Sequence, residues 1–147
     1  MTVASYCSTS CGTPLFVHVL GAMLLDGTLS TVLLLAIVGI RRPQPVFDRA
    51  TFVVLLAGTL PSWLAMRLGG QWLVSKEHLQ HLDATWLNMG FNVGDGGLIV
   101  LLVTTGLAYW ATRRPGGGWP TRAVALLSAL YLVALAVTWF AMAAKWG

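Results

Sequence analysis

The sequence predicts an all-α fold in which four transmembrane helices form a bundle within a single domain of 147 residues. Composition is the first observation behind this prediction, since 56% of the residues are apolar and 10% are charged, far from the average of soluble proteins. The second is that residues 51–66, 96–112 and 123–144 carry no charge. Stretches of this length approach the roughly 20 apolar residues that cross a bilayer.

A pattern of five landmarks that occurs twice is the third observation. Each copy starts with Gly-x4-Asp-Gly, at 21–27 and at 90–96, and passes through an apolar run to Arg-Arg-Pro. An Arg-Ala pair and a second apolar run follow, and each copy ends in Trp-x-Ala-Met, at 63–66 and at 139–142. Two copies in one orientation predict a parallel 2+2 internal repeat. The alternative is convergence, because these landmarks recur in membrane proteins.

The first two helices are expected at about 14–40 and 50–67. No Lys or Arg precedes the first apolar run, and the run is too long for the core of a signal peptide, so we expect this helix to be retained. The second helix contains Pro61, which removes one backbone hydrogen bond and should kink it.

The last two helices are expected at about 87–111 and 121–144. Between the second and third helices lies a segment, about 69–85, that is too polar to span a membrane. The partly helical spacing of Trp72, Leu73 and Leu79 in this segment suggests a short helix at the interface.

Positive charge is concentrated in two of the three loops and predicts the topology. These are the first loop and the third loop, with Arg41, Arg42, Arg49, Arg113, Arg114 and Arg122. The positive-inside rule assigns both loops to the cytoplasm and both termini to the outside of the inner (plasma) membrane. Topology and anionic headgroups account for the net charge of +4, so nucleic acid is not an expected partner.

Two polar stripes cross the predicted spans and indicate a candidate ligand or ion site. His18 and Asp26 share one face of the first helix, and Asn92 and Asp95 lie along one side of the third helix. Ionisable groups inside a membrane are costly, and they usually face the bundle interior and mark a functional site. We therefore expect these four residues and Arg67 to form the site.

Three partners can lower the free-energy cost of holding Asp26 and Asp95 inside a membrane. Arg67 can form a structural ion pair with one carboxylate, a proton can neutralise one of them, or a cation can bind between them. The leading hypothesis is therefore a membrane protein that binds a small ligand, a proton or a cation, as a transporter or as a subunit of a larger complex.

A b-type haem is the main alternative. His18 lies near the outer end of the first helix, and His78 and His81 lie in the outer segment that can fold over it. Imidazole is a common haem ligand, so two of these histidines are candidates to hold the iron of a redox protein. The competing interpretation has His18 hydrogen-bonded to a helix neighbour and the other two histidines solvated.

The two cysteines are candidates for a disulfide loop or a soft-metal site on the outer side. The stretch from Cys7 to Gly12 resembles, over six residues, the dinuclear copper loop of cytochrome oxidase subunit two. The resemblance implies copper as the metal that Cys7 and Cys11 would bind.

The start of the first helix carries a second resemblance. His18-Val-Leu-Gly21, with Gly27 further along, resembles the start of uncharacterised bacterial four-helix membrane proteins, among them the copper-resistance-D-like group and the haem-bearing membrane protoporphyrinogen oxidases. The resemblance implies four helices over almost the whole chain and adds to the case for haem at His18.

No catalytic motif for hydrolysis or phosphate chemistry is present. The sequence contains no Walker loop, no Gly-x-Ser-x-Gly and no His-Glu-x-x-His, so no catalytic residue is assigned. A structural accessory subunit is therefore a third hypothesis. Four short helices enclose little volume, so we expect a homo-oligomer or a membrane-protein partner in every case.

Overall fold

The computed structural model describes residues 12–76, 85–114 and 118–144, and these are almost entirely helical. The elements are α1 (Gly12–Arg41), α2 (Pro45–Val54), the π-helical turn η2 (Leu55–Thr59), α3 (Leu60–Lys76), α4 (Thr85–Arg113) and α5 (Trp119–Ala144). Because α2, η2 and α3 form one continuous helix, four helices are long and apolar enough to cross a membrane. The prediction of an all-α chain with four such helices is confirmed for the described residues.

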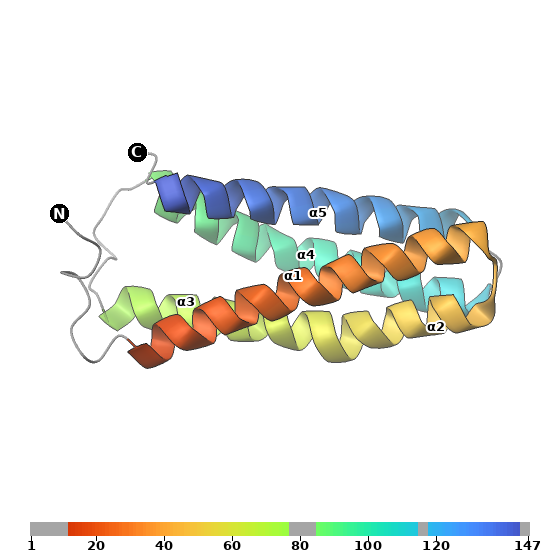
Figure 1. The fold of residues 1–147 in the computed structure, drawn as a ribbon, viewed down its shortest axis with the longest axis horizontal. Helices are drawn as coiled ribbons and strands as arrows, with labels where there is room; N and C mark the ends of the chain where they lie inside the picture. Colours follow the sequence, from red (N-terminus) through yellow and green to blue (C-terminus); the bar gives the residue numbers. More distant parts are fainter. Residues whose placement is uncertain (1–11, 77–84, 115–117, 145–147) are drawn as a thin grey trace.

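Each of the four long helices runs antiparallel to the next one along the chain, and together they form a bundle (Figure 1). α1 begins and α5 ends at the left-hand end of Figure 1, and the two arginine-rich connections lie at the right-hand end. α1 packs against α2, α3 and α5, and α4 packs against α5 and α2. Few contacts join α3 to α4, so the bundle is least closed between these two helices.

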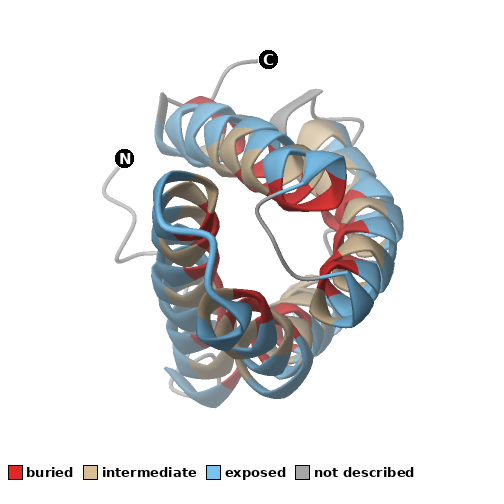
Figure 2. Cartoon of the chain, turned by 90° about the vertical axis from the view of Figure 1, so that its right-hand side faces the viewer, coloured by how far each residue is buried: buried red, intermediate tan, exposed pale blue. Residues whose placement is uncertain are grey.

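Buried residues lie on the helix faces that point toward one another, as the end-on view shows (Figure 2). They form two clusters along the bundle, one around Leu25, Trp63 and Leu101 and the other around Val32 and Leu55. The outer faces also carry large apolar side chains, including Phe16, Met23, Ile99 and Trp139. Soluble monomers rarely expose so much apolar surface.

The second long helix is longer than the sequence suggested, covering Pro45–Lys76 rather than about 50–67. It continues through Gly69 and Gly70 because these glycines pack against α1. A Cβ atom on Gly69 would lie 2.6 Å from the backbone nitrogen of His18. Trp72 and Leu73 therefore belong to this helix and not to a separate interfacial one. Residues 77–84 of that expected segment lie outside the described residues.

A π-helical turn precedes Pro61, the residue at which the sequence predicts a kink. Leu55–Thr59, the turn immediately before the proline, has π-type hydrogen bonding. Proline has no amide hydrogen and its ring crowds the preceding turn, so the hydrogen-bond register of the helix shifts there. The turn lies at the middle of the long helix and separates α2, whose backbone packs close to α4, from α3, whose backbone stands farther from α4 and reaches it through side chains.

A buried carboxylate joins the helices at the arginine-rich end. Asp48 is 4% exposed, and its Oδ1 accepts a hydrogen bond of 3.0 Å from the hydroxyl of Thr121. Both residues lie in the first turn of their helices, where the backbone amide groups favour negative charge. The sequence analysis did not single out Asp48. Its burial and its hydrogen bond with Thr121 indicate that it stabilises the fold by joining α2 to α5.

Two threonines near Asp48 give opposite predictions for stability. The Thr51 hydroxyl is buried and has no hydrogen-bond partner among the described residues. Thr51→Val should therefore raise the free energy of unfolding by about 1 kcal/mol, whereas Thr121→Val should lower it by about 1 kcal/mol because Asp48 loses its donor. Thermal unfolding of the purified variants in one detergent measures both. A destabilised Thr51→Val variant would show that this hydroxyl has a partner.

Candidate functional site

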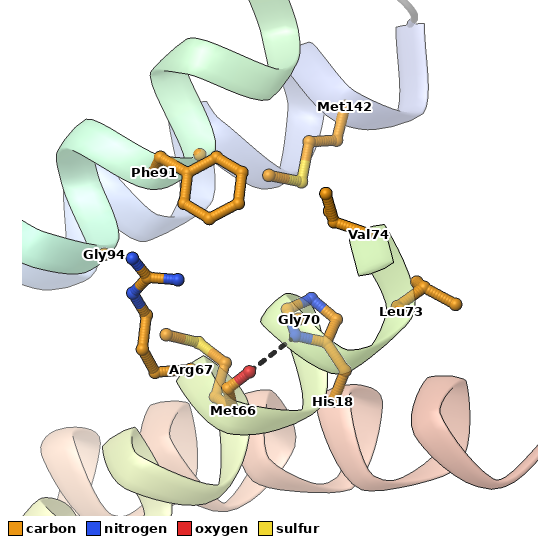
Figure 3. A pocket seen from close by; sticks show the side chains of 10 residues that line it. His18, Met66, Arg67, Gly70, Leu73, Val74, Phe91, Gly94 and Met142 are labelled. Atoms are coloured by element: carbon orange, nitrogen blue, oxygen red, sulfur yellow. Dashed lines mark hydrogen bonds between the residues drawn. The ribbon is translucent and has the colours of Figure 1, made fainter. Parts of the chain in front are cut away.

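A cavity of about 170 Å³ lies between α3 and α4 at the end of the bundle where α1 begins. Glycines create much of this space, because α3 contributes Gly70 and α4 contributes Gly90 and Gly94, which have no side chains to fill it. Figure 3 shows the surrounding side chains. The lining residues are His18, Met66, Arg67, Gly70, Leu73, Val74, Gly90, Phe91, Gly94 and Met142.

His18 reaches the cavity from α1 and has a defined tautomer. Its Nδ1 lies 2.8 Å from the backbone carbonyl oxygen of Met66. A carbonyl oxygen can only accept, so Nδ1 carries the hydrogen, and in the neutral ring Nε2 is left with a lone pair. The second ring nitrogen points away from Met66 toward the middle of the cavity (Figure 3). It has no hydrogen-bond partner in the described part of the chain.

Close packing of α1 against α3 holds the imidazole in place. Gly21 lies against the backbone of Met66, and Gly69 lies against the backbone of His18. Small residues allow such backbone contact between helices in membranes. The imidazole position therefore depends on two glycines, one on each helix.

Arg67 forms the polar wall of the cavity on the side of α4. Its Nε donates to Oδ1 of Asp95 at 2.6 Å and its second guanidinium nitrogen donates to Oδ2 at 3.0 Å, a bidentate pair. The guanidinium carbon lies 4.7 Å from the centroid of the Phe91 ring. The Arg67 side chain is 15% exposed and that of Asp95 is 60% exposed. The sequence suggested an arginine, a proton or a cation as partner for the aspartates. The structure shows Arg67 as the partner of Asp95.

Trp63 joins α3 to α4 beside this ion pair. Its indole Nε1 donates to the backbone carbonyl oxygen of Gly94 at 2.8 Å, and the side chain is 8% exposed. A buried indole commonly finds such a partner, because its N–H is costly to leave unsatisfied. Since Gly94 lines the cavity, this hydrogen bond fixes the α4 wall relative to α3.

Two methionines give the cavity soft, polarizable walls. Met66 and Met142 come from α3 and α5, and the Met142 side chain packs against Gly90. With Nε2 of His18, their thioethers are the side chains of the cavity lining that can bind a soft metal or an iron. Among the described residues no three His, Cys, Asp or Glu side chains cluster in a way that could hold a metal ion.

The size of the cavity sets the size of its ligand. A protein cavity of about 150 Å³ binds one benzene molecule, so a volume of about 170 Å³ accommodates one six-membered ring. A porphyrin contains four pyrrole rings and would require α3 and α4 to move apart.

The predicted site residues are only partly brought together. His18 and Arg67 line one cavity, and Asp95 lies beside it through its ion pair. Asp26 and Asn92 are exposed and do not line the cavity, and among the described residues Asp26 has no hydrogen bond or ion pair. The histidines and cysteines proposed as alternative ligands, Cys7, Cys11, His78 and His81, lie outside the described residues.

Sequence reasoning did not single out most of the cavity walls. The repeated Trp-x-Ala-Met motif contained the signal for Met66 and Met142, since it puts both methionines at the same depth. Gly90 and Gly94 were interpreted as packing residues, and nothing in the sequence distinguishes a glycine that packs from one that leaves space.

Comparison of the chain with protein-family models, with curated proteins and with solved structures finds no match. The resemblance at His18–Gly21 to bacterial four-helix membrane proteins stays a prediction.

Proposed function

We propose that this chain is a small integral membrane protein that binds one small, uncharged and largely apolar ligand between α3 and α4. The observation that carries the proposal is the cavity of about 170 Å³, whose walls are mainly apolar and into which the unpaired nitrogen of His18 points. Small-molecule sites are typically apolar concavities with a few polar groups that fix orientation. Paired aspartates do not form this site, because Asp95 is ion-paired with Arg67 and Asp26 does not line the cavity.

Membrane insertion and orientation are part of the same proposal. Four long apolar helices and the exposed apolar side chains on their outer faces support a multi-pass membrane protein. The basic residues at the connections from α1 to α2 and from α4 to α5 support an orientation in which that end faces the cytoplasm and the membrane is the plasma membrane. With Cys7 and Cys11 replaced by serine, a cysteine introduced at Gly118 should be protected from an impermeant thiol reagent in intact cells. Labelling of this cysteine would indicate the opposite orientation.

Matched contacts in the two halves of the chain support the internal repeat. Gly21 lies against the backbone of Met66 in the first half, and Gly90 lies against the side chain of Met142 in the second. Both pairs join the first glycine of Gly-x4-Asp-Gly to the last residue of Trp-x-Ala-Met. Convergence of short motifs does not require matched partners, so we favour duplication of a helix pair.

A b-type haem is the second candidate for the ligand, and the hydrogen bonding of His18 favours it. Histidines that ligate a metal usually donate their other ring N–H to a carbonyl or carboxylate, as Nδ1 of His18 does to Met66. Native mass spectrometry of protein purified in mild detergent measures bound haem directly. A haem adduct that disappears in His18→Ala would make this a redox protein, and its absence would exclude the candidate.

The exposed position of Asp26 supports contact between this chain and another membrane-embedded helix. It is exposed near the middle of α1, and a carboxylate facing lipid at that depth costs several kcal/mol by common scales. Gly27, Ser30 and Thr31 are also exposed and small, which allows another helix to approach closely. We expect a second copy to cover this face, so that two Asp26 side chains share a proton. The native mass spectrum should show a dimer, and a monomer would contradict this.

A variant that fills the cavity tests ligand binding. Val74→Trp adds a large side chain at the cavity wall, and we expect it to lower affinity for an apolar ring such as p-xylene at least about tenfold. Val133→Trp is the matched control, because Val133 is 61% exposed on the outer face of α5. Ligand-observed NMR on protein in lipid nanodiscs gives both affinities. Equal binding by the two variants would remove the cavity as the site.

A further inference from the structure

We propose that the cavity takes the hydroxyl-bearing ring of a lipid-soluble phenol or hydroquinone, whose hydroxyl donates a hydrogen bond to Nε2 of His18. The inference rests on the proposed ligand-binding function and names the chemical class of the ligand. It follows from the polarity of Nε2 of His18, which has no partner among the described residues, from the cavity volume and from the lateral route between α3 and α4.

The cavity requires a donor on the ligand. Nδ1 of His18 gives its hydrogen to the carbonyl of Met66, so Nε2 of the neutral ring can only accept. Arg67, the other polar side chain in the lining, is held by both oxygens of Asp95. A cationic donor would lose its hydration against walls that are otherwise apolar, so a neutral hydroxyl is the better match.

The cavity also favours an aromatic ring. Its volume of about 170 Å³ fits one six-membered ring. Phe91 and the thioethers of Met66 and Met142 surround that volume, as Figure 3 shows. Aromatic rings pack favourably against other rings and against the sulfur of methionine. An aliphatic alcohol would satisfy His18 without using these walls.

The open side indicates a ligand that arrives from lipid. The cavity is not fully enclosed, and the backbones of α3 and α4 stand apart beside it, which gives a ligand a lateral route between these two helices. Leu68 and Trp72 on α3 are 56% and 46% exposed next to the lining residues Arg67 and Leu73. An apolar tail on the ring can therefore lie along the outside of α3 while the ring occupies the cavity.

The experiment compares p-cresol with p-xylene, which have nearly the same shape and differ in one hydroxyl. Affinities are measured by ligand-observed NMR for the full chain in nanodiscs and for His18→Asn. Asparagine can still donate to the carbonyl of Met66 but has no atom at the position of Nε2. We expect the preference for p-cresol over p-xylene to fall about threefold to tenfold in His18→Asn, the range for one neutral hydrogen bond. Asn92→Ala, exposed on α4 and outside the lining, should leave the preference unchanged.

The outcomes separate the inference from the proposed function. If both rings bind and the preference does not depend on His18, the hydroxyl assignment is overturned and the cavity remains a ligand site. If neither ring binds, both proposals fail. Where p-cresol does bind through His18, a short-chain ubiquinone distinguishes a hydroquinone from a simple phenol as the source of the hydroxyl. If the reduced form of this ubiquinone binds more tightly than the oxidised form, the ligand is a hydroquinone. If p-cresol binds and the ubiquinone shows no such difference, the ligand is a simple phenol.

Discussion

Gly21→Val is expected to lower the free energy of unfolding by about 3 kcal/mol or more. A Cβ atom on Gly21 would overlap the backbone of Met66, and backbone atoms of a helix cannot move aside as a flexible side chain can. α1 and α3 must therefore separate, and the hydrogen bond from His18 to Met66 would lengthen with them. Titration with a denaturing detergent, followed by tryptophan fluorescence, measures the loss.

The same substitution elsewhere controls for the change of residue type. Gly106 on α4 is exposed, and a Cβ atom there would meet nothing within 4 Å. Gly106→Val should change the free energy of unfolding by no more than about 0.5 kcal/mol, as expected for a surface site. Comparable losses in both variants would attribute the effect to valine in a helix and would contradict the close contact at Gly21.

The number and class of the helices follow from the sequence because they depend on composition along the chain. Long uncharged runs have to be helical wherever water is excluded, since only a helix satisfies its own backbone groups. The end of the second helix could not be predicted in the same way. Gly69 and Gly70 are normally helix-breaking signals, and they are tolerated here because α1 packs onto them, a contact between residues far apart in sequence.

The candidate site was predictable where charge identifies it. A buried arginine needs a carboxylate, so the sequence predicts that Arg67 pairs with one aspartate, and the structure shows that this aspartate is Asp95. The cavity itself could not be predicted, because its volume depends on how far α3 and α4 stand apart, and no local pattern encodes that spacing. Asp26 illustrates the same limit, since the repeat predicts equivalent positions for Asp26 and Asp95 but not equivalent partners.

Removing one partner of the ion pair should destabilise the protein strongly. Arg67→Leu leaves the Asp95 carboxylate without its two donors inside a candidate span, and we expect a loss of about 2–3 kcal/mol. This is below the roughly 3–5 kcal/mol typical of fully buried pairs, because the Asp95 side chain is 60% exposed. Asp95→Leu should cost a similar amount or less, since the Arg67 guanidinium then loses its carboxylate partner and keeps Phe91 and the neutral Gln71 amide beside it. Denaturing-detergent titration gives both values.

The double variant decides whether the losses come from unpaired charge. Arg67→Leu combined with Asp95→Leu leaves neither charge, so it should be more stable than either single variant, because a buried ion pair can often be replaced by apolar groups at little cost. Asn92→Leu, one turn before Asp95 on α4 and also exposed, controls for adding leucine to this face and should be nearly neutral. Additive losses in the double variant would mean that Arg67 and Asp95 act independently, and the ion pair would then contribute nothing to the wall of the cavity.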